Sequence, residues 1–119
     1  MKRGPNLSIN DILENIDLIE DSLQKIAEPE FKSNRLLIDA TLRRLEIIGE
    51  AIKNIPQSFT EKYPKIPWKK IAGFRDILTH SYFGVKLDNV WLIIKKDLPY
   101  LRTEIMKIRK NLEKRSMPK

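Results

Sequence analysis

The chain has 119 residues, no cysteine and one histidine, and its lysines and arginines outnumber its acidic residues to give a formal net charge of +7. The lack of cysteine excludes disulfides and thiolate metal sites, and a single histidine excludes a multi-histidine zinc site within one chain. The positive charge favours a polyanionic partner such as nucleic acid, although surplus lysine also serves solubility.

The length is that of a single domain, which we expect to span residues 1–119. Polar residues interrupt the basic N-terminal segment where a signal peptide needs a continuous apolar run. No stretch approaches the roughly 20 apolar residues of a membrane span. We therefore expect a cytoplasmic protein that makes no membrane contact.

The first predicted helix begins at Ser8-Ile9-Asn10-Asp11, which resembles a capping box. Apolar residues then recur at helical spacing. They are Ile12, Leu13, Ile16, Ile19, Leu23 and Ile26. The pattern predicts a helix to about Ala27, and Glu28-Pro29-Glu30 interrupts it because a proline disfavours helix in the residue before it.

The second predicted helix runs from about Ser33 to Asn54, and its apolar positions form a face too wide for a narrow stripe. They are Leu37, Ile38, Leu42, Leu45, Ile48, Ala51, Ile52 and Ile55. Such a helix is typical of the centre of a bundle. Gly49 within it costs up to about 1 kcal/mol relative to alanine, which indicates close approach of a neighbouring backbone.

Residues 56–67 predict a loop with one short helical turn, and Pro67 suits the first position of a third helix. Asp88 suits the cap of the last long helix, which Pro99 should bend. The bundle seam of that helix is Trp91, Ile94, Leu98, Leu101, Ile105, Ile108 and Leu112. The tail from about Lys114 is basic. With no alternation of period two, the sequence predicts an all-α antiparallel bundle of four main helices.

The third helix carries the most unusual feature of the sequence, an arginine within an apolar stripe. The stripe is Trp68, Ile71, Arg75, Leu78 and Tyr82. A guanidinium there has to pair with an anion, extend to a groove or line a site, because burying it unpaired is costly.

Several polar residues near this stripe are candidates for supporting roles. His80 lies about 140° around an ideal helix from Arg75, so the two converge only through the long arginine side chain, a helix end or a subunit boundary. Asp76 can reach His80 and favour its charged form, or the two make only a weak surface contact. Glu50 of the second predicted helix can reach the site around Arg75, although a structural ion pair with a basic residue is the stronger expectation.

The last helix also carries a basic cluster, most simply read as a solvated face, with RNA contact as a secondary possibility. The cluster comprises Lys95, Lys96, Arg102, Lys107, Arg109 and Lys110.

The segment Arg75-Asp76-Ile77-Leu78-Thr79-His80-Ser81-Tyr82 resembles the R-x4-H-x-Y motif of HEPN proteins of the HepT group. The resemblance continues through Tyr82-Phe83-Gly84 and extends over most of the chain. Further matching segments are 45–51, 66–73, Val90-Trp91 and Asp97-Leu98-Pro99. Where the broader family often has asparagine after the arginine, this chain has Asp76.

The resemblance implies a metal-independent endoribonuclease toxin without a cofactor, in which Arg75 and His80 occupy the catalytic positions. It also implies that Tyr82 accepts AMP from a nucleotidyltransferase antitoxin of the MNT type, which silences the toxin, as in a type VII-like toxin–antitoxin system. Asp76 and Glu50 are possible supporting residues.

RNA cleavage without a metal ion needs a base for the 2′-hydroxyl, an acid for the leaving 5′-oxygen and a cation for the phosphorane. One histidine serves poorly as base and acid in the same step, whereas two chains supply two copies of His80. We therefore expect a homodimer with both Arg75 and His80 segments lining a shared cleft. Two alternatives remain, a non-catalytic helical module that binds nucleic acid or nucleotide and a purely structural dimer partner.

Overall fold

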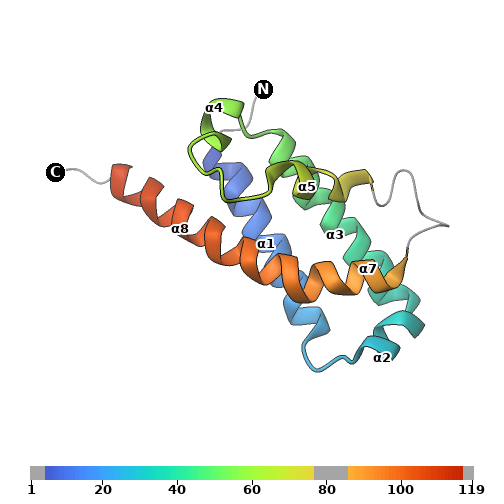
Figure 1. The fold of residues 1–119 in the computed structure, drawn as a ribbon. Coiled ribbons are helices and arrows are strands. Elements are labelled where there is room, and N and C mark those ends of the chain that lie inside the picture. The colour runs from blue at the N-terminus through green and yellow to red at the C-terminus, as the bar shows by residue number, and fades with distance from the viewer. Residues whose placement is uncertain (1–4, 77–85, 117–119) are drawn as a thin grey trace.

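The computed structural model describes residues 5–76 and 86–116, in which every regular element is helical (Figure 1). Three helices of 19 residues form the body of the bundle, namely α1 (Pro5–Leu23), α3 (Arg35–Lys53) and α8 (Leu98–Ser116). Shorter helical elements connect them, namely α2 (Glu28–Ser33), α4 (Gln57–Thr60), α5 (Trp68–Ala72), α7 (Leu87–Leu92) and the π-helical η1 (Ile93–Asp97). Because α1 packs against α3 and α8, and α3 against α5 and α2, the prediction of an all-α bundle is confirmed.

The core is built from the apolar faces that the sequence indicates. The predicted positions of the three long helices are at most 8% exposed, apart from a few that are partly buried against the core. The partly buried ones are Ile26, Leu37, Trp91 and Leu112. The segments that connect the long helices add buried side chains from Phe31, Ile66, Phe74 and Val90.

The predicted start and end of the first helix are wrong. α1 begins at Pro5, so Ser8 lies within it, fully buried, and its hydroxyl has no hydrogen-bond partner among the described residues. The helix ends at Leu23 rather than near Ala27, because Lys25 adopts a left-handed backbone conformation with φ of 67°. The Ile26 N–H then donates to the Leu23 carbonyl and closes the turn.

The proline after α1 has a second role that the sequence analysis missed. Pro29 lies in the first turn of α2, where its missing N–H would have no helical partner anyway. Asn34 follows α2 and caps α3 by accepting a hydrogen bond from the Leu37 N–H at 3.1 Å. The chain therefore turns between α1 and α3 through one short helix.

The third helix is not continuous as predicted. Pro67 precedes α5 rather than beginning it, α5 ends at Ala72, and Gly73 forms a turn before residues 74–76 become helical again. The catalytic position predicted at His80 and the AMP acceptor predicted at Tyr82 lie outside the described residues, as does Leu78 of the predicted stripe.

The last helix runs unbroken from α7 through η1 into α8 (Figure 1). Its cap is Lys86 rather than Asp88, which lies in the first turn and pairs with Lys32 of α2. Pro99 follows directly after a π-helical turn in which the Leu98 N–H donates to Ile93. In an α-helix the ring of Pro99 would clash with the carbonyl four residues earlier. The wider π-helical turn lies at this place, so the helix accommodates the proline by widening.

None of the helices in the described part of the chain combines the length and hydropathy that crossing a bilayer requires.

Candidate functional site

The candidate site is built where residues 74–76 meet the middle of α3. A Cβ atom placed on Gly49 would lie 2.6 Å from the Arg75 backbone nitrogen and 2.9 Å from the Ala72 carbonyl oxygen. Only a residue without a side chain allows this approach, so the close backbone contact predicted for Gly49 is confirmed. The contact fixes the backbone of Arg75 against α3.

The Arg75 side chain is not buried in an apolar stripe. Phe74, three residues after the buried Ile71, enters the core at 3% exposure, and Arg75 is exposed. Its Nε lies 3.1 Å from Oε2 of Glu50, and the two side chains are 45% and 52% exposed. The predicted ion pair of Glu50 with a basic residue is therefore present, and its partner is Arg75 itself.

Arg75 and Glu50 lie at the edge of a surface hollow of about 420 Å³ between α1 and α3. Ile47 and Ala51 of α3 supply its apolar lining. Its polar lining comes from Asp11, Arg43, Glu46, Glu50, Asn54 and Arg75. An exposed guanidinium at such a place can exchange a carboxylate for a phosphate, which it also binds in bidentate fashion.

Sequence reasoning missed four polar residues of this hollow, Asp11, Arg43, Glu46 and Asn54. Arg43, Glu50 and Asn54 lie seven and four residues apart and so share one face of α3, a spacing that the sequence displays. Asp11 comes from α1, and no local pattern indicates its place. Arg43 is held by Glu46, whose Oε1 lies 2.6 Å from its Nη1.

The remaining predicted site residues can be placed only in part. Asp76 is exposed, and its backbone N–H donates to the Gly73 carbonyl at 2.9 Å. Its proposed contact with His80 lies outside the described residues, as does Tyr82. Among residues 5–76 and 86–116, no group of three or more histidine, cysteine, aspartate or glutamate side chains is placed to hold a metal ion.

Two contacts hold α5, and with it the Arg75 segment, in place. The Trp68 indole N–H donates to the carbonyls of Thr60 and Tyr63 at 3.1 and 3.0 Å, which anchors the loop before α5. Lys70 Nζ lies 3.2 Å from a carboxylate oxygen of Asp97 in η1. The backbone leading to Arg75 is therefore tied to both the loop and the last helix.

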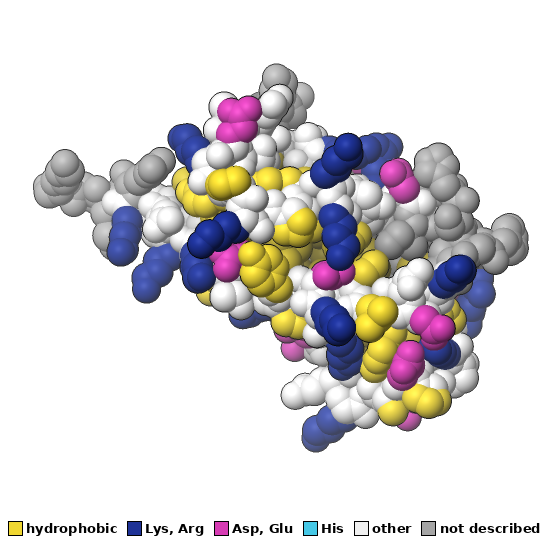
Figure 2. All heavy atoms as spheres, viewed as in Figure 1, with side chains coloured by type: hydrophobic (Ala, Val, Ile, Leu, Met, Phe, Trp, Pro, Cys, Tyr) yellow, Lys and Arg dark blue, Asp and Glu magenta, His cyan; other side chains and the backbone are white. Residues whose placement is uncertain are grey.

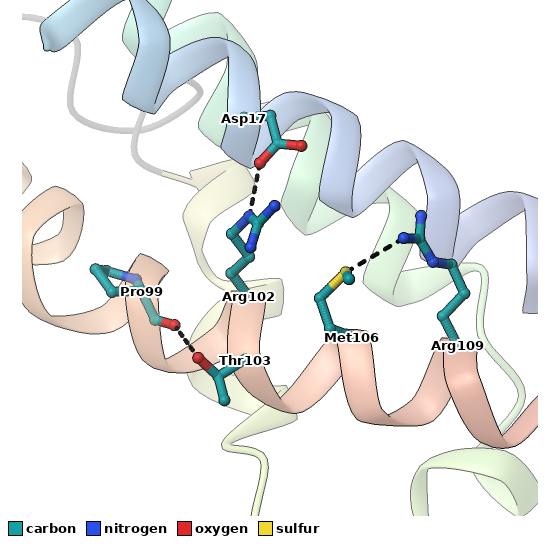
Figure 3. A network of polar contacts seen from close by, with 6 residues as sticks. All are labelled: Asp17, Pro99, Arg102, Thr103, Met106 and Arg109. Atoms are coloured by element: carbon teal, nitrogen blue, oxygen red, sulfur yellow. Dashed lines mark hydrogen bonds and ion pairs between the residues drawn. The ribbon is translucent and has the colours of Figure 1, made fainter.

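The basic cluster on the last helix is partly structural. Figure 3 shows Arg102 of α8 reaching Asp17 of α1, with Nε and Oδ1 2.7 Å apart, and Arg109 contacting the sulfur of Met106. The hydrogen bond with Asp17 raises the pKa of the Arg102 guanidinium further above its ordinary value. Arg102 therefore joins α1 to α8, whereas the contact of Arg109 with Met106 lies within α8. Both arginines are partly buried, so the expected solvated face is only partly solvated.

Comparison with known proteins adds independent information. A family model described as "Ribonuclease HepT-like" matches residues 12–108. "Gamma-glutamylcyclotransferase and putative RNase" of Methanocaldococcus jannaschii is 49% identical over 96% of this chain, which spans only 51% of that relative's length. "Probable ribonuclease HepT" of Thermococcus cleftensis is 43% identical over 92% of this chain and 100% of its own length.

A third relative, "Putative RNase" of Caldanaerobacter subterraneus subsp. tengcongensis, is 40% identical over 89% of this chain and 95% of its own length. No solved structure matches the chain. The family model covers most of the chain, and it includes Glu50, the Arg75 segment and the last helix as far as Ile108. The chain therefore belongs to the ribonuclease HepT-like family.

Proposed function

We propose that the chain is an endoribonuclease that cleaves RNA without a metal ion, with Arg75 and His80 as its catalytic residues. The observation that carries the proposal is the exposed Arg75 guanidinium, fixed at its backbone against Gly49 and paired with Glu50 beside a hollow. Family membership and relatives named as ribonucleases support it. The net charge of +7 suits a polyanionic substrate.

In the proposed reaction, one imidazole takes the proton from a 2′-hydroxyl, whose oxygen attacks the adjacent phosphorus. A second, protonated imidazole gives its proton to the 5′-oxygen as the P–O bond breaks. The products are a 2′,3′-cyclic phosphate and a free 5′-hydroxyl. Arg75 stabilises the charge on the phosphorane, since a guanidinium stays protonated and is planar.

The chain has only one histidine, so the two imidazoles come from two chains, and the proposed active form is a homodimer. Light scattering at micromolar concentration should give the dimer mass, and a monomer that is still active would contradict this step. Asp76 is proposed to orient His80 within each protomer.

We further propose that the chain is the toxin of a toxin–antitoxin pair. Its antitoxin is a nucleotidyltransferase that attaches AMP to Tyr82. The adduct brings a negative phosphodiester near Arg75, so it should compete with RNA for the guanidinium. Tyr82→Phe keeps the ring and loses the acceptor oxygen, so the variant should stay active and escape silencing. Adenylation of this variant to the level of wild type would refute the assignment.

The direct test of the proposed function is RNA cleavage by wild type, Arg75→Ala and His80→Ala. His80→Ala should abolish cleavage and growth inhibition while circular dichroism stays unchanged. Arg75→Ala should do the same, although its backbone packs on α3 and its unfolding has to be measured in parallel. Salt-sensitive RNA binding without cleavage by wild type would favour the non-catalytic module instead.

A further inference from the structure

A second basic surface lies away from the hollow at Arg75, on the outward side of α8 and next to α5. We name it the lysine patch. Its members are Lys65, Lys69, Lys96, Tyr100, Lys107 and Lys110, all exposed. On the face seen in Figure 2, dark-blue side chains lie along α8 and over α5, with magenta side chains among them.

Two contacts bring the parts of the patch together. The Tyr100 hydroxyl of α8 donates to the Lys65 carbonyl at 3.2 Å, which places the loop before α5 beside α8. Lys70, the neighbour of Lys69, pairs with Asp97 of η1. Residues far apart in the sequence therefore form one surface.

The α8 part of the patch follows one face of the helix. Tyr100, Lys107 and Lys110 are seven and three residues apart, so they lie within an arc of about 80°. Lys96 precedes them by one turn. From Lys96 to Lys110 the helix rises by about 21 Å, which leaves room for several successive phosphates of an extended strand.

The lysine patch carries more positive than negative charge. Some cations elsewhere are paired, as in Lys32 with Asp88 and Arg102 with Asp17. Within the described part of the chain, Lys65, Lys69, Lys96 and Lys110 form no ion pair. Lys107 does form an ion pair, with Glu104 at 3.3 Å, whose side chain is 20% exposed.

Tyr100 gives the patch an aromatic surface among its lysines. Tyr100 is 45% exposed, and its hydroxyl donates to the Lys65 carbonyl. A large aromatic exposed on a charged surface is a stacking platform for an unpaired base, and lysines on either side suit the adjoining phosphates.

We propose that the lysine patch binds single-stranded RNA, with Tyr100 stacked on one base and the lysines on the phosphates. This site shares no residue with the hollow at Arg75. The lysine patch would hold the RNA substrate outside the cleavage site. It would thereby raise the local concentration of RNA at the cleavage site. The inference rests on the proposed function for the choice of RNA as the polyanion.

The test measures binding of a fluorescein-labelled, uridine-rich single-stranded RNA by anisotropy over a range of salt concentrations. All variants are made in the full chain carrying His80→Ala, which keeps the RNA intact. The patch variant is Lys96→Gln/Lys110→Gln, and its matched control is Lys25→Gln/Lys53→Gln, which removes the same charge from exposed lysines elsewhere. Tyr100→Ala is compared with Tyr100→Phe.

The patch variant should bind more weakly than its control, and its salt dependence should fall by about 1.4 in log–log slope, about 0.7 for each lost phosphate contact. Tyr100→Ala should weaken binding by about 5- to 150-fold, whereas Tyr100→Phe, which keeps the ring and loses only the hydrogen bond to Lys65, should weaken binding much less. Equal affinities and slopes for the patch variant and its control would overturn the proposal. A wild-type chain that binds through the patch yet never cuts RNA would refute the proposed function and leave this inference standing.

Discussion

Replacing Gly49 by alanine tests the contact on which the site is built. The added methyl group would lie 2.6 Å from the Arg75 nitrogen and 2.9 Å from the Ala72 oxygen, both backbone atoms. A backbone segment cannot move aside as the end of a flexible side chain can. α3 and the segment 72–75 therefore have to separate.

The expected magnitude is the difference between two opposing effects. Overpacking of this kind costs typically about 1–3 kcal/mol, and the rigid contacts at Gly49 favour the upper half of that range. Alanine gains about 1 kcal/mol in helix propensity over glycine. The free energy of unfolding should fall by about 1–2 kcal/mol, and the melting temperature by several degrees.

The assay is urea and thermal unfolding followed by circular dichroism, with RNA cleavage measured on the same samples. The matched control is Gly73→Ala, which adds the same methyl group where φ is −67° and the nearest atom is the Lys70 oxygen at 3.2 Å. The control should change the stability by less than about 1 kcal/mol. Cleavage should fall in Gly49→Ala because Arg75 is displaced. A Gly49→Ala protein as stable and as active as wild type would refute the reasoning.

Three further predictions concern single side chains. Glu50→Gln should lower the free energy of unfolding by less than about 1 kcal/mol, since both partners of the ion pair are half exposed, and should tighten RNA binding at low salt. Weaker RNA binding would show that Glu50 acts by positioning Arg75. Burial raises the pKa of Glu20 above its ordinary value of 4.5. The free energy of unfolding should therefore fall as the pH rises through this raised pKa and Glu20 ionises. Glu20→Gln should match wild type near pH 4 and be slightly more stable at pH 7, by less than about 0.5 kcal/mol, and the opposite order in urea unfolding would contradict this sign. Asn34→Ala should lower the free energy of unfolding by about 0.5–2 kcal/mol through loss of the α3 cap, whereas Asn34→Asp should keep the cap. Equal melting temperatures of wild type and the two variants would exclude a stabilising role for this cap.

The apolar pattern of the sequence predicts the bundle well because helix packing depends on which residues share a face. The seam of the last helix, from Ile94 to Ile108, is buried as predicted. Helix ends were predicted less well, because they depend on single residues in particular conformations. Ser8 looks like a cap but lies inside α1, and the left-handed Lys25 ends that helix early.

The candidate site could also be predicted only in part. The close contact at Gly49 and the ion pair of Glu50 follow from the sequence, because each residue is unfavourable at its position unless a neighbour compensates for it. The exposure of Arg75 does not, because either Phe74 or Arg75 can follow Ile71 on one helix face, and the fold buries Phe74. Asp11 joins the hollow only through the packing of α1 on α3, which no local pattern encodes.

The central claim is metal-independent attack by a 2′-hydroxyl, promoted by Arg75 and His80. Its most direct test is cleavage of an end-labelled RNA in excess chelator, beside the same RNA with deoxyribose at the nucleotide whose 2′-hydroxyl would attack. Wild type should cut the RNA to a 2′,3′-cyclic phosphate and a 5′-hydroxyl, and leave the substituted RNA intact. Cleavage of the substituted RNA at the same bond, or a need for a divalent cation that persists after repurification, would contradict the account.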